Sequence, residues 1–143
     1  MGLVGDTNAA MFARLREHPL LANIVYDTAS RQKRGDDQPL PIPYVMVFAD
    51  NGQHTSGLLA EMSERSLFNY TLHLVADTGE QLDRMGDAVL DQIRNWRPNV
   101  PGYTFFKARH HFSTPDNTNN RLLPTPVYRV DEIGLRCVQG KVA

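Results

Sequence analysis

The strongest constraint on the fold is an alternation of apolar and polar side chains from Ser66 to Asp77. One parity of this segment is apolar (Phe68, Tyr70, Leu72, Leu74 and Ala76), and the other carries Asn69, Thr71 and His73. A period of two predicts an antiparallel strand with one buried face. The chain must therefore fold around a sheet that is covered on at least one side.

A helix is predicted directly after this strand. Thr78 and Gln81 have the spacing of a capping box, in which the threonine hydroxyl accepts from the third helical amide and the glutamine reaches back to the cap. The apolar residues that follow form one stripe at helical spacing: Leu82, Met85, Val89, Ile93 and Trp96. We expect a helix from Gly79 to Trp96, about 27 Å long, which is enough to cross one face of a sheet.

The remaining elements are weaker in pattern. A helix is expected over 8–17, a brief strand near 24–26, a strand covered on both faces over 44–49, and strands over 103–112 and 127–138. The segment 53–65 fits either a helical turn or the tip of a projecting hairpin. The apolar parity of the last strand changes near Asp131 and Glu132, which predicts a bulge there.

These elements predict an α+β fold within a single domain spanning 1–143. We expect a mainly antiparallel sheet of four to five strands, with one long helix packed on a face and a short N-terminal helix. Exposed loops are expected at about 29–43, 51–66 and 113–125, where prolines, glycines and charged residues collect. A globule of this length would be about 35 to 40 Å across.

Composition narrows the class of protein. The chain has 143 residues, a formal net charge of −1 and one cysteine, Cys137. The charge argues against a dedicated nucleic-acid binder, and one cysteine cannot form an intrachain disulfide. The sequence has no apolar run near eighteen residues and no signal-peptide pattern, so we expect no membrane association and a cytosolic chain.

No set of residues predicts catalysis. His110 and His111 are neighbours on an expected strand and should point to opposite faces, so they cannot hold one metal together. Cys137 lacks a nearby base and is expected to behave as a small buried hydrophobe. The pairs Asp36–Asp37 and Asp131–Glu132 are adjacent rather than set across a cleft. We therefore expect no enzyme, no catalytic residue, no metal site and no cofactor.

The order of elements and two short segments resemble a known family. Leu15-Arg16-Glu17-His18-Pro19-Leu20-Leu21-Ala22 precedes a polar insertion, and Leu40-Pro41-Ile42-Pro43-Tyr44-Val45-Met46-Val47 follows it. This arrangement is similar to the tail terminator, or tail completion, proteins of long-tailed (siphovirus-type) bacteriophages. The similarity spans nearly the whole chain.

The resemblance implies a virion assembly protein that performs no catalysis. Six copies would form a ring that caps the end of the tail tube, stops tube polymerisation and forms the tail side of the head–tail joint. Its partners would be itself, the major tail tube protein and a head–tail connector protein. DNA would only pass through the lumen. The expected location is the head-proximal end of the tail, with assembly in the host cytoplasm.

Candidate interface residues follow from features that a single domain leaves exposed. They comprise an apolar group, a basic group and one residue at the start of the 44–49 strand: Leu58, Leu59 and Met62; Arg31, Lys33 and Arg34; and Tyr44. A ring needs two different surfaces that meet between neighbours. The apolar group could equally be a satellite of the core, and the basic group a solvated loop.

Three alternatives remain open from the sequence. The first is a neck or head-completion (connector) protein of the same structural class. The second is a small-ligand binding module or enzyme that uses His73, His110 or Arg109 at a concave sheet face. The third is nucleic-acid binding through five basic side chains: Arg31, Lys33, Arg34, Lys107 and Arg109.

Overall fold

The computed structural model describes residues 2–27, 40–50, 53–55, 65–118 and 126–139. The elements in chain order are α1 (Leu3–Arg16), β1 (Val25–Asp27), β2 (Tyr44–Ala49), β3 (Gln53–Thr55), β4 (Arg65–Ala76), α3 (Gly79–Ile93), β5 (Tyr103–Phe105), β6 (Arg109–Ser113), β7 (Asn117–Thr118) and β8 (Val127–Gln139). The fold is α+β, as the sequence predicts.

The strands among the described residues form one eight-stranded sheet. Its main path is β1-β2-β4-β8-β5, with β3 beside β4 and both β6 and β7 beside β8. β1 pairs with β2 in parallel, and every other described pairing is antiparallel. The expected sheet of four to five strands is too small, because short strands add to both edges of the β4–β8 pair.

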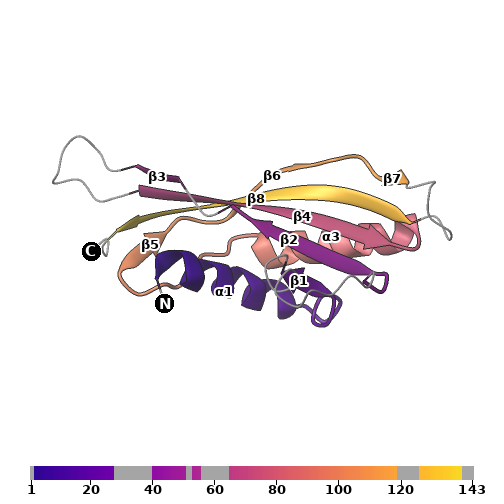
Figure 1. Cartoon of the computed structure of the whole chain (residues 1–143), viewed down its shortest axis with the longest axis horizontal. Helices are drawn as coiled ribbons and strands as arrows, with labels where there is room; N and C mark the ends of the chain where they lie inside the picture. The colour runs from indigo at the N-terminus through magenta and orange to yellow at the C-terminus, as the bar shows by residue number, and fades with distance from the viewer. Residues whose placement is uncertain (1, 28–39, 51–52, 56–64, 119–125, 140–143) are drawn as a thin grey trace.

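The β4–β8 pair is the spine of the sheet. Its register runs without interruption from the pair Arg65–Val138 to the pair Ala76–Val127. Strands of 12 and 13 residues extend about 40 Å, whereas helices of 14 and 15 residues extend only about 21 to 22 Å. The molecule is therefore elongated along the strands rather than round (Figure 1).

Both helices cover the same face of the sheet (Figure 1). Their lengths are nearly equal, so the expectation of one long and one short helix is wrong. Two reciprocal hydrogen bonds join them: Arg14 Nε donates to the Gln92 carbonyl oxygen at 2.7 Å, and Gln92 Nε2 donates to the Arg14 carbonyl oxygen at 2.6 Å. The helices form one layer beneath the sheet.

α1 begins at Leu3 rather than near residue 8. Its N-cap, Gly2, makes no side-chain capping hydrogen bond. Leu3 and Val4 pack partly against the core, and Thr7 is buried at 0% exposure on the packing face. Packing of this face against the core therefore determines where the helix starts. No capping residue in the sequence marks that position.

α3 begins where the capping box predicts. Thr78 Oγ1 accepts a hydrogen bond from the Gln81 amide at 3.2 Å, and Gln81 Oε1 accepts one from the Asp77 amide at 3.1 Å, one residue before the cap itself. The helix ends at Ile93, before the expected Trp96, because Arg94 leaves the helical region with a ψ of 124° and Asn95 follows with a φ of 59°. Left-handed backbone at that point cannot continue an α-helix.

Replacing the cap gives a first testable prediction. Thr78→Ala removes the acceptor for the Gln81 amide and is expected to lower the free energy of unfolding by about 1 kcal/mol. Thr78→Ser keeps a hydroxyl and should lose much less. Urea denaturation followed by circular dichroism measures both. Equal stability of the alanine and serine variants would contradict the capping role.

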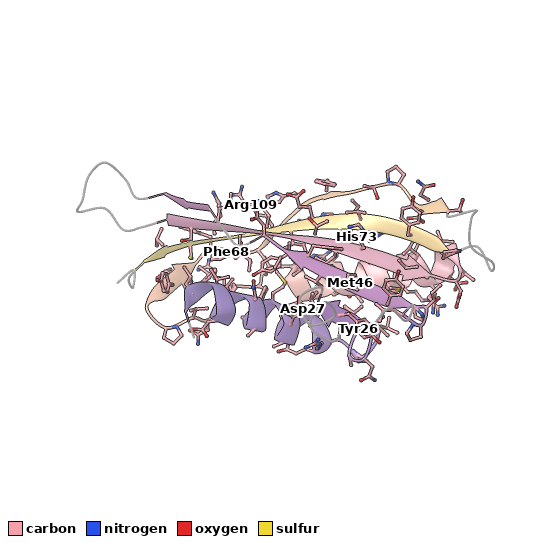
Figure 2. The ribbon with its side chains drawn as sticks, in the orientation of Figure 1. Tyr26, Asp27, Met46, Phe68, His73 and Arg109 are labelled. Carbon is pink, nitrogen blue, oxygen red and sulfur yellow. The ribbon has the colours of Figure 1, made fainter. Side chains whose placement is uncertain are left out.

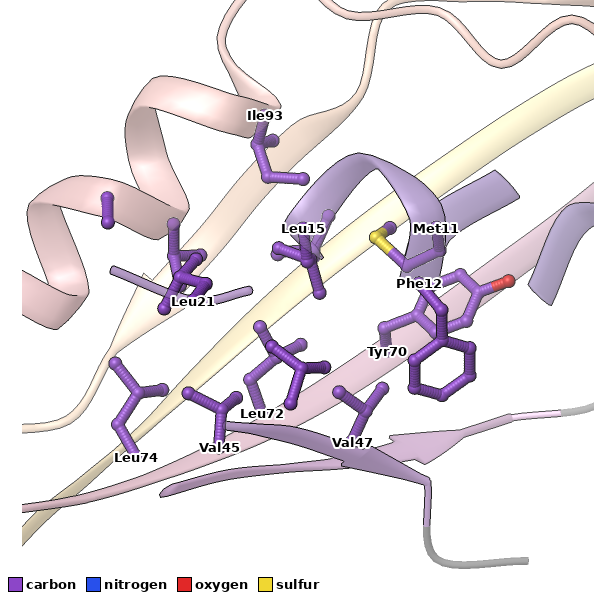
Figure 3. Packing of buried hydrophobic residues seen from close by; sticks show 14 of the residues in the cluster. Met11, Phe12, Leu15, Leu21, Val45, Val47, Tyr70, Leu72, Leu74 and Ile93 are labelled. Carbon is purple, nitrogen blue, oxygen red and sulfur yellow. The ribbon is translucent and has the colours of Figure 1, made fainter. Parts of the chain in front are cut away.

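The core lies between the sheet and the helix layer (Figure 3). The predicted inward parity of β4 is confirmed, since all five of its residues are at 0% exposure: Phe68, Tyr70, Leu72, Leu74 and Ala76. Met11 and Leu15 of α1 and Ile93 of α3 pack on them from the helix side. Tyr70 also donates a hydrogen bond from its hydroxyl to Asn8 Oδ1 at 2.7 Å, which ties β4 to α1.

Three strand expectations need correction. β2 is buried on one face only, since Val45 and Val47 are at 0% exposure but Phe48 is 41% exposed. The expected strand over 103–112 is broken between β5 and β6, because the Ala108 amide donates to the Trp96 carbonyl oxygen instead of joining the ladder. Strand residues also occupy parts of the expected loops at 51–66 and 113–125.

The expected bulge lies on the partner strand. The register of β8 against β4 is unbroken through Asp131 and Glu132, whereas that of β6 shifts between His110 and Phe112. The change of parity in the sequence has another cause: Asp131 occupies a core-facing position of β8 at 0% exposure. A buried carboxylate thus stands where the pattern expects an apolar residue.

Candidate functional site

Among the described residues, no helix lies on the face of the sheet opposite α1 and α3 (Figure 1). We call the outward-facing side chains of β2, β4, β6 and β8 the uncovered face. Ordinary solvated sheet faces are polar, but much of this one is aliphatic or aromatic: Tyr44, Met46, Phe48, Leu67, Val75, Phe112, Tyr128, Val130 and Val138. A sheet face with this many apolar side chains, of which Phe48 and Phe112 are largely exposed, is typical of an interaction surface.

Phe48 and His73 form the centre of the β2 side of this face. Their ring centroids lie 4.8 Å apart, and Met46 is paired directly with His73 across the two strands (Figure 2). Partial burial lowers the pKa of His73 below its ordinary value of 6.5. The imidazole is therefore held in its neutral form among apolar neighbours.

The opposite side of the uncovered face is basic. Arg109 is exposed on β6 beside Gly134, and Arg136 is exposed two residues further along β8. The Arg136 guanidinium lies over the Phe106 ring at 5.6 Å from its centroid, and Phe106 is itself 47% exposed. Glu132 is the one carboxylate on this face among the described residues. We call Arg109 and Arg136 the basic patch.

The bulge in β6 shapes this side. His111 is the extra residue, and its ring lies over Gly134, where an added Cβ would sit 2.2 Å from His111 Nε2. A side chain at position 134 would therefore displace the His111 ring from this position. His110, by contrast, is paired with the buried Ile133 and faces the helices. The prediction that the two histidines point to opposite faces is confirmed.

A polar cluster lies beneath the sheet at Asp131. Ser113 donates a hydrogen bond from Oγ to Asp131 Oδ1, and Arg129 Nη2 lies 3.3 Å from Asp131 Oδ2. The Arg129 guanidinium occupies the space above Gly86 of α3, where an added Cβ would lie 1.6 Å from Nη2. The helix thus needs a glycine at this position to accommodate the ion pair.

The same cluster contains the three residue types of a hydrolase triad in a different order. His110 Nε2 lies 3.0 Å from Ser113 Oγ and 3.8 Å from Asp131 Oδ1. In a triad, the histidine stands between the serine and the carboxylate. Here the serine stands between them and gives its own hydrogen bond to Asp131, so this geometry does not orient His110 as a base toward a nucleophile.

The predicted interface residues fall mostly beyond the part of the chain that the structure describes. Six of them lie outside the described residues: Leu58, Leu59, Met62, Arg31, Lys33 and Arg34. Tyr44 is described; it begins β2 on the uncovered face, paired with Val75. The pair Asp36–Asp37 also lies outside the described part.

The residues of the small-ligand alternative do not converge. His110 faces the helices, whereas His73 and Arg109 lie on the uncovered face, on opposite sides of β8 and well apart along the sheet (Figure 2). A cleft of about 640 Å³ lies elsewhere, between the turn after α1 and the first turn of α3. Its lining includes the apolar residues Leu20, Ile24 and Met85 and the acidic residue Asp77.

Cys137 behaves as the sequence predicts. It is 1% exposed within the core, and burial raises the pKa of its thiol. No group of three or more histidine, cysteine or acidic side chains with metal-binding geometry occurs among the described residues. None of the described helices is long and apolar enough to span a membrane.

Comparisons with known proteins support the fold. A scan of the sequence against models of protein families finds no match, and a search of curated proteins finds none either. Among solved structures, the chain is similar to one in the virion of native gene transfer agent (GTA) particle, with a TM-score of 0.65 and 16% sequence identity. The match covers 97% of this chain and 98% of that chain. The two chains therefore share one fold over their whole lengths.

The lowered pKa of His73 predicts a pH dependence of stability. Well above pH 6.5, the imidazole is neutral in both the folded and the unfolded chain. As the pH falls below 6.5, the unfolded chain takes up the proton first, so the free energy of unfolding decreases until the folded-state pKa is passed. His73→Gln should remove this part of the dependence, as measured by urea denaturation between pH 5 and 7. An unchanged profile in the variant would contradict the prediction.

Proposed function

We propose that this chain is a structural subunit of a virion. The observation that carries the proposal is the full-length similarity in fold to a chain of the GTA virion. Shared fold alone does not assign function, but two features of the described residues agree with an assembly role. The chemistry-bearing side chains do not converge, and a broad apolar sheet face has no covering layer.

The finer proposal is a tail terminator. Six copies would close into a ring on the end of the tail tube, stop tube polymerisation and present the other side of the ring to the head–tail connector. The ring would act without catalysis and let DNA pass through its lumen. An elongated protomer with a covered and an uncovered face suits this role, because a ring joins two different surfaces of each copy.

Ring formation and tube capping test the proposal together. The full chain is examined by native mass spectrometry and negative-stain electron microscopy, alone and with tail tubes of the same particle. We expect closed rings of six at one end of the tubes, and tubes that no longer elongate. A chain that stays monomeric at every concentration and leaves the tubes uncapped would overturn the proposal. Rings that bind the portal-side ring but not the tube would indicate a neck protein instead.

A further inference from the structure

The two faces of the protomer are complementary to each other. The uncovered face is apolar on the β2 side, around Phe48, and basic on the β6–β8 side, at Arg109 and Arg136. The helix layer on the opposite face divides in the same direction, because α1 contacts β1 and α3 contacts β4, β8 and β6. The apolar side of the uncovered face therefore lies opposite α1, and its basic side lies opposite α3.

The solvent side of α3 is acidic. Four exposed carboxylates follow one stripe of the helix at helical spacing (Glu80, Asp83, Asp87 and Asp91), together with the exposed Arg84 and Arg94. Arg84 is paired with Glu80 at 2.7 Å. Asp83, Asp87 and Asp91 follow one another at intervals of four, which places like charges side by side. A cationic surface in contact with this stripe would relieve that repulsion.

The solvent side of α1 carries small side chains in its middle, between the partly exposed Asp6 of its first turn and the charged residues at its C-terminal end. Ala9 and Ala13 are exposed on it, and Arg16 and Glu17 are exposed only at its C-terminal end. An apolar sheet face packs more closely on alanines than on a row of carboxylates. The α1 side of the helix layer thus suits the Phe48 side of a second sheet, and the α3 side suits its basic patch.

The edges of the sheet offer a poorer route to assembly. β6 is interrupted by the bulge at His111 and is followed by Pro115, and β1 has only three residues. Bulges, prolines and short strands are devices that prevent strand addition at an edge. Association through faces is therefore favoured over continuation of the sheet from one copy to the next.

We infer that the uncovered face of one copy packs on the helix layer of the next copy, with Arg109 and Arg136 against Asp87 and Asp91. Asp87 and Asp91 lie toward the C-terminal end of α3. Just beyond that end, the Ala108 amide donates to the Trp96 carbonyl oxygen, which brings the start of β6, and with it Arg109, close to this part of the helix. A symmetric contact between two uncovered faces would bring no such stripe of carboxylates to the basic patch. This inference rests on the proposed ring and names the surfaces that close it.

Charge reversal on each side tests the contact. Arg109→Glu with Arg136→Glu reverses the patch, and Asp87→Lys with Asp91→Lys reverses the stripe. Each double variant should raise the concentration for half-assembly by about 100-fold, because like charges then face each other across the contact. Combining all four changes in one chain should restore assembly to within about tenfold of the unmodified chain, as should mixing the two double variants.

A matched control separates this contact from an effect of net charge. Arg84→Glu with Arg94→Glu changes the net charge as much as the patch variant does, but makes the stripe more acidic. Assembly of this control should equal or exceed that of the unmodified chain. Native mass spectrometry and microscopy are done under the condition, free or on tail tubes, that assembles the unmodified chain, after circular dichroism shows that every variant is folded.

The outcomes separate the contact from the proposed function. Rings that form equally well from the patch variant, or reversed charges that fail to restore each other, would overturn this contact while leaving the virion role intact. Rings that form normally from the patch variant but no longer retain duplex DNA would place the patch against nucleic acid and would also overturn it. An unmodified chain that never assembles overturns the proposed ring itself.

Discussion

Replacing Asp131 with alanine is expected to lower the free energy of unfolding by about 3 to 5 kcal/mol, the largest effect among single polar substitutions proposed for this chain. The Arg129 side chain is only 14% exposed, and its Nε is buried with no hydrogen-bond partner among the described residues. Without Asp131, the guanidinium keeps its charge but loses its counterion. Ser113 also loses the acceptor of its hydroxyl hydrogen bond.

A paired variant shows whether the uncompensated charge causes this loss. Arg129→Met with Asp131→Leu replaces the ion pair by apolar side chains of similar length, which is often nearly neutral in buried positions. This double variant should recover most of the stability lost by Asp131→Ala. Guanidinium denaturation at pH 7 measures both variants. A double variant that is less stable than the single one would show that the charges themselves hold the strands to α3.

Tyr70→Ala is expected to cost a similar amount, about 3 to 5 kcal/mol, for a different reason. Tyr70 is fully buried in the middle of β4, where it packs against α1, so truncation leaves a cavity the size of its ring. Its pKa is raised by burial, so the hydroxyl stays protonated and donates to Asn8. Tyr70→Phe keeps the ring and should cost only about 1 kcal/mol.

The two tyrosine variants should also differ in where they loosen the molecule. Loss of the ring should increase hydrogen exchange in both β4 and α1, whereas loss of the hydroxyl should affect chiefly α1 around Asn8. Mass spectrometry after proteolysis resolves the two segments. A phenylalanine variant as unstable as the alanine variant would mean that the hydrogen bond, rather than packing, joins the helix to the sheet.

The best-predicted elements were those in which local pattern and tertiary role agree. β4 shows its buried parity in every second residue, and α3 shows both its cap and its stripe, so the sequence located each to within a few residues. The start of α1 was missed because Leu3 and Val4 are ordered by packing against the core, which leaves no capping signature.

The candidate site was less accessible to sequence reasoning. The sequence predicts a bulge at Asp131 because a carboxylate at a core position interrupts the alternation of apolar and polar residues. The ion pair with Arg129 and the space that Gly86 provides for it are visible only in the three-dimensional structure. The uncovered face was missed for a related reason. β2 is apolar on both sides, which predicts a strand covered on both faces, and only the arrangement of the helices reveals that, among the described residues, one side has no helix over it.

The uninterrupted register of β4 against β8 makes the protomer rigid along its long axis. The paired residues of β4 and β8 extend from the end beside β3 to the end beside the first turn of α3. Near the middle, Tyr70 is hydrogen-bonded to α1. A displacement of one end of the β4–β8 pair must move the whole pair, because antiparallel strands cannot slide past each other without breaking the hydrogen bonds between them. A macromolecule that binds either end of the β4–β8 pair would therefore reorient the protomer as one rigid body.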